Sequence, residues 1–429
     1  MITSPAFAGK RYAVLGLARS GRSAVATLLA SGARVMAWDK SEAAREAVAH
    51  EAESVDPLTA DLAGYDGVVV SPGVPLNRHP IAEKAREAGV PLIGDIELFA
   101  QARGDLPPHR VVGITGTNGK STTTALVHHI LGTAGVPSLM AGNIGVPILA
   151  EDPLPQGGVY VLELSSYQLD LTHGLDCDVA ALLNVTPDHL DRYASFAAYR
   201  ASKLRLFEMQ SPANIAVFSG SDQVSRDAYR DRLSRIQDST CLARTDDVQG
   251  QENWPALQGP HNAENAAIAT AICRGLGIGD DRIDHGLRTF SGLPHRMELV
   301  AEKQGVRFVN DSKATNPDST APALAAFPHV HWIVGGLAKS DTLGPCEAQL
   351  GHVRAAYTIG EAGSMFARLL EGRVPVRESE LLVTAVREAA DAAEAGEVVL
   401  LSPACASFDQ FRDYEARGDA FRAAVEALA

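Results

Sequence analysis

The segment Arg110–Ser121, RVVGITGTNGKS, constrains the fold more than any other part of the chain. Its apolar start predicts a buried strand, and residues 122–135, TTTALVHHILGTAG, are typical of a helix that ends at a glycine. The glycine-rich turn between them can bring backbone N–H groups close to phosphate oxygens, and a helix N-terminus adds partial positive charge. We therefore expect a phosphate cradle in which Lys120 neutralises the β- and γ-phosphates and Ser121 offers its hydroxyl to Mg²⁺.

This motif departs from the strict P-loop pattern, which requires a glycine five residues before Gly119, where the chain has Ile114. The alternative is a strand-to-helix turn that contains Gly-Lys-Ser by chance. Because the predicted strand and helix flank the turn in the correct order, the sequence favours nucleotide phosphate binding.

Composition and charge narrow the class of protein. The chain has 429 residues, of which 46% are hydrophobic and 21% are charged, as expected for a globular protein of several domains. A net charge of −14 without any Lys/Arg run argues against nucleic-acid and membrane-surface partners. The five cysteines form no CxxC pair, which argues against zinc and disulfide frameworks. The first ten residues lack the pattern of a signal peptide and no apolar run reaches the length of a membrane span, so we expect a cytoplasmic protein.

Strand-like apolar runs alternate with helix-like segments, which predicts an α/β protein with largely parallel sheets. We divide it into a Rossmann-like N-terminal domain at residues 1–98, a central P-loop ATPase-like domain at 99–292, and a Rossmann-like C-terminal domain at 293–429. Beyond the phosphate loop, we expect strands at Tyr12–Leu15, Arg34–Trp38, Gly67–Val70, Val159–Leu164, Val179–Leu183, Arg307–Val309, Val330–Val334, Ala356–Ile359 and Val398–Leu401. The expected helices include Ser23–Ser31, Ile81–Ala88, Tyr199–Glu208, Ala263–Leu276 and 383–395.

The first domain contains an incomplete dinucleotide fingerprint. In Gly16–Gly21, Ala18 replaces the middle glycine that lets a pyrophosphate approach the backbone. Asp39 ends the next strand, where a ribose-binding acid is expected. A nicotinamide site, a Rossmann turn for another nucleotide, and a packing turn beside an exposed acid all remain open here.

Polar residues also follow two strands of the central domain. Glu163 ends one strand, which places it beside the phosphate loop if the two strands are neighbours. Asp188, His189 and Asp191 follow another strand, although a helix cap would explain Asp188 without any chemistry. His189 is a candidate metal ligand. Asn265, at the start of the next helix, is either a cap or a reader of an adenine edge.

Three loops of the C-terminal domain follow predicted strands and are expected to line one site, because open α/β sheets bind ligands at the carboxyl ends of their strands. They are Asn310–Asn316, Gly335–Lys339 and Leu401–Phe411. Arg296, at the domain junction, could stabilise a transferring phosphate.

Taken in order, these motifs resemble those of the Mur ligase family, the ATP-dependent amide ligases that build the peptidoglycan stem peptide. The matching runs are GTNGKST at 116–122, ELSS at 163–166, NVTPDHLDR at 184–192, HNAEN at 261–265, HR at 295–296 and DSKATN at 311–316. Further runs are similar to the branch that adds D-glutamate: SPG at 71–73, GDIELF at 94–99, NDSKATN at 310–316 and SPACASFDQF at 402–411. The chain lacks the DNPR-type motif of members that add diaminopimelate or lysine. Folylpolyglutamate synthases share the phosphate loop but not the SPACASFDQF segment at 402–411.

The resemblance implies ligand roles. The UDP part of UDP-N-acetylmuramoyl-L-alanine would contact Arg19, Ser20, Asp39, Lys40, Ser71, Gly73 and Asn143. ATP would contact Gly116, Thr117, Asn118, Gly119, Lys120, Ser121, Thr122, Asn265, Arg296, Asp311 and Lys313. D-glutamate would contact Thr315, Lys339, Ser402 and Phe408.

The resemblance also implies catalytic and metal-binding roles. One Mg²⁺ would lie at Ser121 and Glu163, and a second at His189, with Lys203 carbamylated by CO₂ so that it positions the second ion. Lys120, Glu163, His189, Lys203 and Arg296 would be catalytic.

The implied reaction forms an acyl phosphate from ATP and the L-alanyl carboxylate, which the amine of D-glutamate then attacks. The C-terminal domain would close on ATP, and the enzyme would act as a monomer on small-molecule substrates only. The alternatives are a nicotinamide oxidoreductase, a non-catalytic nucleotide-binding regulator, and a ligase that adds L-glutamate.

Overall fold

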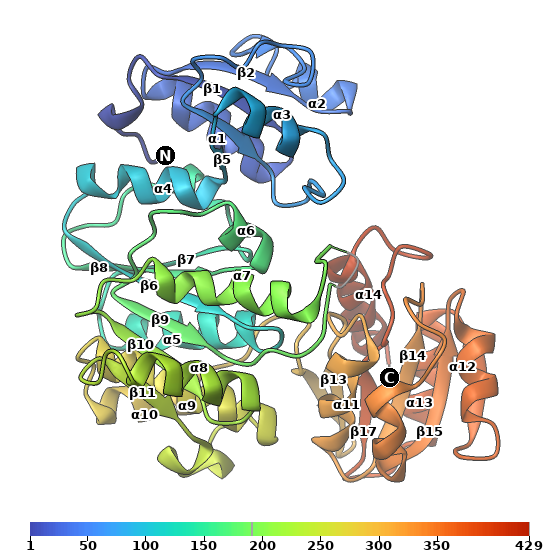
Figure 1. Cartoon of the computed structure of the whole chain (residues 1–429). Helices are drawn as coiled ribbons and strands as arrows, with labels where there is room; N and C mark the ends of the chain where they lie inside the picture. Colours follow the sequence, from blue (N-terminus) through green and yellow to red (C-terminus); the bar gives the residue numbers. More distant parts are fainter. Residues whose placement is uncertain (190–191, 429) are drawn as a thin grey trace. The chain divides into compact units, whose positions relative to one another are not determined.

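The computed structural model describes residues 1–189 and 192–428. It contains two compact units, one formed by Met1–Val248 with Glu264–Gly286 and the other by Gln249–Ala263 with Leu287–Ala429. The first unit holds two sheets and the second holds one (Figure 1). No helix within the described residues combines the length and apolarity needed to cross a membrane.

The first sheet is parallel and has the order β3-β2-β1-β4-β5. Leu15 of β1 pairs with Trp38 of β2 and Val70 of β4, so three adjacent strands end together. The strands are β1 (Arg11–Leu15), β2 (Arg34–Trp38), β3 (Glu53–Ser54), β4 (Gly67–Val70) and β5 (Leu92–Ile93). The helices are α1 (Arg19–Ala30), α2 (Glu42–Glu46), α3 (Ile81–Ala88) and α4 (Asp95–Ala102). The predicted Rossmann-like arrangement of this region is confirmed.

The second sheet is also parallel, with the order β11-β10-β9-β6-β8-β7. Its strands are β6 (His109–Thr115), β7 (Ser138–Gly142), β8 (Gly158–Glu163), β9 (Val179–Leu182), β10 (Ile215–Ser219) and β11 (Thr240–Ala243). Its helices are α5 (Lys120–Thr133), α6 (Ser166–Asp170), α7 (Phe196–Glu208), α8 (Gln223–Leu233), α9 (Pro260–Gly275) and α10 (Asp280–Thr289).

Strands β7, β10 and β11 were not predicted from the sequence. Helix α5 begins at Lys120 rather than at residue 122, because Gly119 has a left-handed φ of 82° and the helical conformation starts directly after it.

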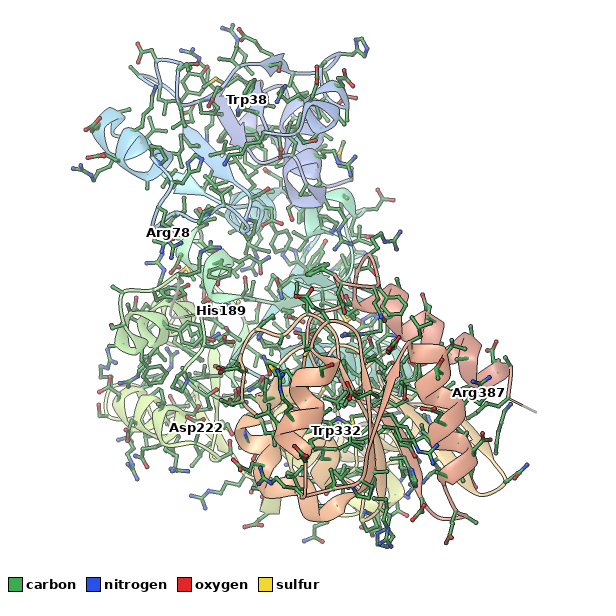
Figure 2. All side chains as sticks on the ribbon, turned by 90° about the vertical axis from the view of Figure 1, so that its right-hand side faces the viewer. Trp38, Arg78, His189, Asp222, Trp332 and Arg387 are labelled. Carbon is green, nitrogen blue, oxygen red and sulfur yellow. The ribbon has the colours of Figure 1, made fainter. Side chains whose placement is uncertain are left out.

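The third sheet has the order β12-β13-β17-β14-β15-β16, with β12 antiparallel to β13 and the other pairs parallel. Trp332 of β14 is fully buried in its core (Figure 2). The strands are β12 (Glu298–Lys303), β13 (Val306–Asn310), β14 (Val330–Gly335), β15 (Val353–Ile359), β16 (Val376–Glu380) and β17 (Val398–Leu401). The helices are α11 (Pro317–Ala325), α12 (Gly363–Leu370), α13 (Leu382–Ala392) and α14 (Tyr414–Glu426).

The central strand β6 needs a glycine where the core is tightest. A Cβ atom on Gly113 would lie 2.7 Å from the Cys177 sulfur and 3.0 Å from Leu206 Cδ1. We expect Gly113→Ala to lower the free energy of unfolding by about 1–3 kcal/mol, because the core must shift to accept the methyl group. Gly104→Ala is the matched control, since no described atom lies within 4 Å of the place its methyl group would take. Guanidinium unfolding of both variants tests this, and equal stabilities would contradict it.

Candidate active site at the phosphate loop

The loop between β6 and α5 requires glycine because another side chain lies against it. A Cβ atom on Gly119 would lie 2.3 Å from the side-chain oxygen of Asn265, which is 5% exposed. Asn265 also accepts a hydrogen bond from Thr123 Oγ1 at 3.2 Å. The structure therefore brings Asn265 of α9 directly to the phosphate loop.

Asn184, which follows β9, supports the loop from the other side. Its backbone carbonyl accepts from Thr117 N at 2.9 Å, and its side-chain oxygen accepts from Asn118 N at 2.9 Å. From the sequence, Asn184 was identified only as part of a motif. Its position after β9, the neighbour of β6, is the signal that could have assigned it to the loop.

Two lysines meet at the carbonyl oxygen of Gly116. Lys120 Nζ donates to it at 3.0 Å and Lys203 Nζ donates to it at 2.7 Å. Lys203 is only 1% exposed. Its burial, and then the charge of Lys120, hold the pKa of Lys203 well below its ordinary range, although Asp188, Asp170 and Glu163 oppose that shift. Burial and the neighbouring Lys120 therefore both disfavour the charged form of Lys203 beside the phosphate loop.

The acid at the end of β8 lies next to the phosphate-binding strand, as predicted. Glu163 pairs in register with Ile114 of β6 and Gly142 of β7. Asn143 Nδ2 donates to Glu163 Oε1 at 2.8 Å, whereas the buried Oε2 has no hydrogen-bond partner among the described residues. A buried carboxylate oxygen that lacks a partner fits a cation ligand.

Glu163 and the buried hydroxyl of Ser121, the second residue of α5, are hard oxygen donors suited to Mg²⁺. No group of three or more His, Cys, Asp and Glu residues within the described part of the chain could hold a metal ion. That is compatible with Mg²⁺, which uses one or two protein carboxylates together with substrate phosphates.

His189 occupies a strained backbone position with a φ of 54°. Its Nε2 lies 3.5 Å from Asp188 Oδ2, and its ring centroid lies 5.1 Å from that of Tyr167. Imidazole is a softer donor than Mg²⁺ prefers, so its metal role stays a prediction. Leu190 and Asp191 of the same motif lie outside the described residues.

A cavity of about 510 Å³ opens at the carboxyl edge of the first sheet. Three predicted residues, Asp39, Lys40 and Gly73, line it. Asp39 Oδ2 accepts from Leu17 N at 2.7 Å and thereby holds the turn after β1. Ser71 has a similar role, since its hydroxyl donates to the Gly16 carbonyl at 3.0 Å.

Three further residues that line this cavity were not predicted from the sequence. Arg45 lies over the Trp38 ring, with its guanidinium carbon 4.5 Å from the ring centroid, and His79 also lines the cavity. Because Trp38 directly precedes the predicted residue Asp39, its position in the sequence could have indicated that it lines the same cavity. Of the other predicted residues, Arg19 and Ser20 are in the first turn of α1.

In the second unit, Asp311 follows β13 and is 7% exposed. Burial raises its pKa to about 7, although the hydrogen bond from Ser402 and the charge of Arg296 favour the ionised form. Ser402 is fully buried and its hydroxyl donates to Asp311 Oδ2 at 2.8 Å. Ser402 thus contacts Asp311 beneath the loops, and its proposed contact with D-glutamate remains a prediction.

The other predicted residues of this unit lie on adjacent loops. Lys339 Nζ donates to Thr315 Oγ1 at 3.5 Å, and Leu337 pairs with Ala406 in an isolated β-bridge. Phe408 is 70% exposed. The loops after β13, β14 and β17 therefore meet as predicted.

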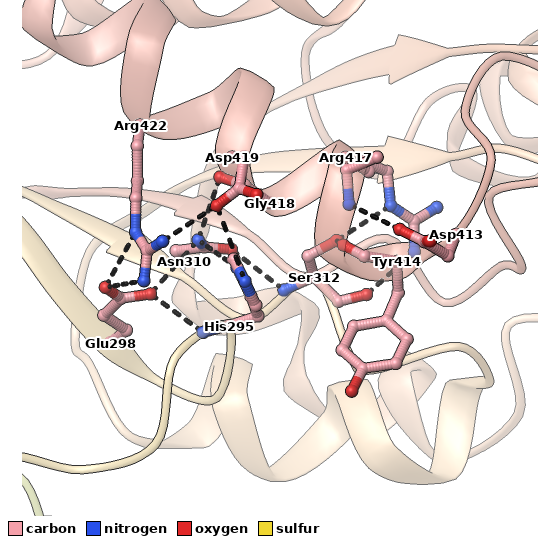
Figure 3. Close-up of polar contacts among 11 residues, drawn as sticks. His295, Glu298, Asn310, Ser312, Asp413, Tyr414, Arg417, Gly418, Asp419 and Arg422 are labelled. Carbon is pink, nitrogen blue, oxygen red and sulfur yellow. Dashed lines mark hydrogen bonds and ion pairs between the residues drawn. The ribbon is translucent and has the colours of Figure 1, made fainter. Parts of the chain in front are cut away.

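A buried arginine of α14 joins two of these loops (Figure 3). Arg417 is 1% exposed and donates to Ser312 Oγ at 3.0 Å, the Ser312 carbonyl at 2.8 Å, the Cys405 carbonyl at 3.0 Å and the Ala406 carbonyl at 3.2 Å. Its role was not predicted from the sequence, because its partners are distant in the chain and mostly backbone carbonyls.

His295 lies beside this network (Figure 3), with a φ of 61° and its Nδ1 3.0 Å from Asn310 Nδ2. A Cβ atom on Gly418 would lie 2.0 Å from His295 Nδ1, which explains the glycine after Arg417.

Three family descriptions match the chain. They are a MurD-like N-terminal domain of Mur ligases at residues 10–94, the Mur ligase middle domain at 114–273, and the Mur ligase glutamate ligase domain at 295–405. Each matched range falls on a different one of the three sheets.

Two relatives that match this chain along its whole length have the same name. The chain is 64% identical to a UDP-N-acetylmuramoylalanine–D-glutamate ligase of Novosphingobium aromaticivorans, over 100% of this chain and 97% of the relative. It is 60% identical to the protein of the same name from Sphingopyxis alaskensis, over 100% of both chains.

Solved structures share the fold at low identity. UDP-N-acetylmuramate-alanine ligase MurC of Thermotoga maritima has a TM-score of 0.59 at 16% identity, over 97% of this chain and 99% of its own. MurF ligase of the same organism, solved with ADP, has a TM-score of 0.58 at 17% identity, over 98% of this chain and 96% of its own. With its sheets, its phosphate loop and these matches along its whole length, the chain belongs to the Mur ligase family.

Proposed function

We propose that this protein catalyses the ATP-dependent addition of D-glutamate to UDP-N-acetylmuramoyl-L-alanine. The observation that carries the proposal is the arrangement at the phosphate loop, where Lys120 and the buried Lys203 meet at the Gly116 carbonyl. The unpartnered oxygen of Glu163 supports a cation site at the end of the adjacent strand. Relatives that bear this enzyme's name support the choice of substrates.

Each domain has a separate task in this proposal. Residues 1–98 bind the UDP substrate in the cavity beside Asp39, residues 99–292 bind ATP, and residues 293–429 bind the amino acid. Family membership favours this assignment over a nicotinamide oxidoreductase or a non-catalytic regulator. We also propose that the protein works in the cytoplasm as a monomer.

Catalysis would depend mainly on positioning. An oxygen of the L-alanyl carboxylate attacks the γ-phosphorus and ADP leaves, and then the amine of D-glutamate attacks the acyl carbon and phosphate leaves. Because a carboxylate and a phosphate repel each other, Lys120 and the backbone N–H groups of the loop must hold the phosphates in line. Bound Mg²⁺ would supply further neutralisation of phosphate charge through Ser121 and Glu163. Asn265, Arg296, Asp311 and Lys313 would hold the rest of ATP.

Turnover with defined amino acids tests the proposed function. We expect phosphate release from ATP, Mg²⁺ and UDP-N-acetylmuramoyl-L-alanine with D-glutamate, but not with L-glutamate, meso-diaminopimelate or no amino acid. Mass spectrometry of the product provides the check. Turnover with L-glutamate would keep the ligase class and change the substrate, whereas no turnover in protein that binds ATP would overturn the proposal.

We further propose that Lys203 is carbamylated. A buried amine with a lowered pKa can attack the carbon of CO₂ and release a proton, and the resulting carbamate would be an anion near Lys120. Lys203→Ala should lower activity on the order of 100-fold or more, because it misplaces groups at the reacting centre. Added acetate should restore part of that activity. Ala201→Gln, an exposed change on the same helix, is the control.

A ¹³C-bicarbonate signal on the wild-type protein that is absent from Lys203→Ala gives a second readout. Full activity of the Lys203 variant would rule the carbamate out.

The raised pKa of Asp311 makes stability depend on pH in one direction. Between its ordinary value of 3.8 and the folded value of about 7, the folded state keeps a proton that the unfolded state has lost. The contribution of this residue to stability therefore falls as pH rises across that range. We expect wild type to gain stability relative to Asp311→Asn when pH drops from about 7.5 to about 5. Guanidinium unfolding at both pH values measures it, and a pH-independent difference would contradict it.

A further inference from the structure

A second cavity, of about 280 Å³, lies in the first unit and is lined by residues of α7, α8 and β10 and of the segments that follow α7 and α8. None of its lining residues belongs to the sites described above. Phe207 and Phe218 form a stacked pair in its wall, with ring centroids 4.5 Å apart. The lining residues are Leu204, Phe207, Glu208, Gln210, Phe218, Ala228, Asp231, Arg232, Arg235 and Ile236.

The guanidinium of Arg232 is the unusual group of this cavity. Arg232 is 7% exposed, and its Nη1 donates to the Phe207 carbonyl at 3.0 Å. Its Nε and Nη2 are buried and have no hydrogen-bond partner within the part of the chain that the structure describes. Buried arginines are normally paired, because an unpaired charge away from water is costly.

The two unpartnered nitrogens belong to the side of the guanidinium that binds carboxylates in a fork. Arg422 uses the same edge of its guanidinium, since its Nε and Nη2 both donate to one carboxylate oxygen, Glu298 Oε1, at 2.9 and 2.5 Å. Arg232 thus offers the donor edge that Arg422 uses, without the carboxylate.

No described carboxylate accepts a hydrogen bond from this edge. Asp231 is in an ion pair with Arg235 at 3.2 Å, and Glu208 also lines the cavity. Arg235 is the nearby charge that, after burial, lowers the pKa of Arg232. Gln210 also lines the cavity, and its buried Oε1 is an acceptor to which no described residue donates.

We propose that this cavity is a binding site for a small aromatic carboxylate. Its carboxylate would be held by the Nε–Nη2 edge of Arg232, its ring would lie against the aromatic wall, and a hydroxyl on the ring would donate to Gln210. Since water does not reach the two nitrogens, binding of the ligand requires side chains of the cavity wall to rearrange.

Isothermal titration of the full-length protein with 4-hydroxyphenylacetate tests the proposal. The uncharged 4-hydroxyphenylacetamide is the matched ligand control. We expect one-to-one binding of the acid and at least about tenfold weaker binding of the amide. Saturating ATP and D-glutamate should not displace the acid, which separates this cavity from the active site. Equal binding of acid and amide, displacement by D-glutamate, or no binding at millimolar concentration would each overturn the proposal.

Three variants locate the site. Arg232→Lys keeps the charge and removes the fork, so it should weaken binding at least about tenfold, whereas the exposed Arg235→Lys should change it less than about threefold. If circular dichroism shows that Arg232→Lys does not fold, Ala228→Leu decides, because it fills the cavity and should abolish binding. Unchanged affinity in the folded Arg232→Lys, or in Ala228→Leu, would exclude this cavity as the site.

Discussion

The phosphate loop depends on one carbonyl group. Gly116 O accepts hydrogen bonds from both Lys120 and Lys203, which come from two different helices. Two ammonium groups at one oxygen repel each other in a buried place, and the lowered pKa of Lys203 relieves that repulsion. Conversion of the Lys203 amine into a carbamate, as proposed above, would replace the repulsion between the two lysines with attraction.

Sequence patterns were most informative where the chemistry is local. The strand, glycine turn and helix around Lys120 are contiguous, so periodicity and turn residues predicted them to within two residues at the helix start. Glu163 was predicted to lie beside the loop on the condition that β6 and β8 are neighbours, and their pairing confirms it. The edge strands β7 and β11 were harder to predict from the sequence, because they have partly exposed residues and little apolar periodicity.

Local sequence patterns could not predict contacts between segments that are distant in the chain. Arg417 donates mainly to backbone carbonyl oxygens. Every residue has such an acceptor, so the amino-acid sequence does not indicate which ones Arg417 contacts. Ser402 follows β17 where a ligand contact is expected, yet its hydroxyl is directed to Asp311 and Thr320. Position at a strand end thus predicts that a residue is near a site, whereas burial decides whether it faces the ligand or supports the loop beneath it.

Burial of a charged group has no single meaning in this protein, and the hydrogen-bond partners distinguish the cases. Arg417 is almost fully buried, but each of its three guanidinium nitrogens donates to a protein oxygen, so it is a structural link between two loops. Arg232 is buried to a similar degree, and its carboxylate-binding edge has no partner among the residues described. Glu163 presents the anionic counterpart, with one oxygen held by Asn143 and the other unpartnered in the same part of the chain. Because desolvating an unpaired donor or acceptor is costly, a bound ligand of opposite charge would compensate each of these two groups, a cation at Glu163 and, as proposed above, a carboxylate at Arg232.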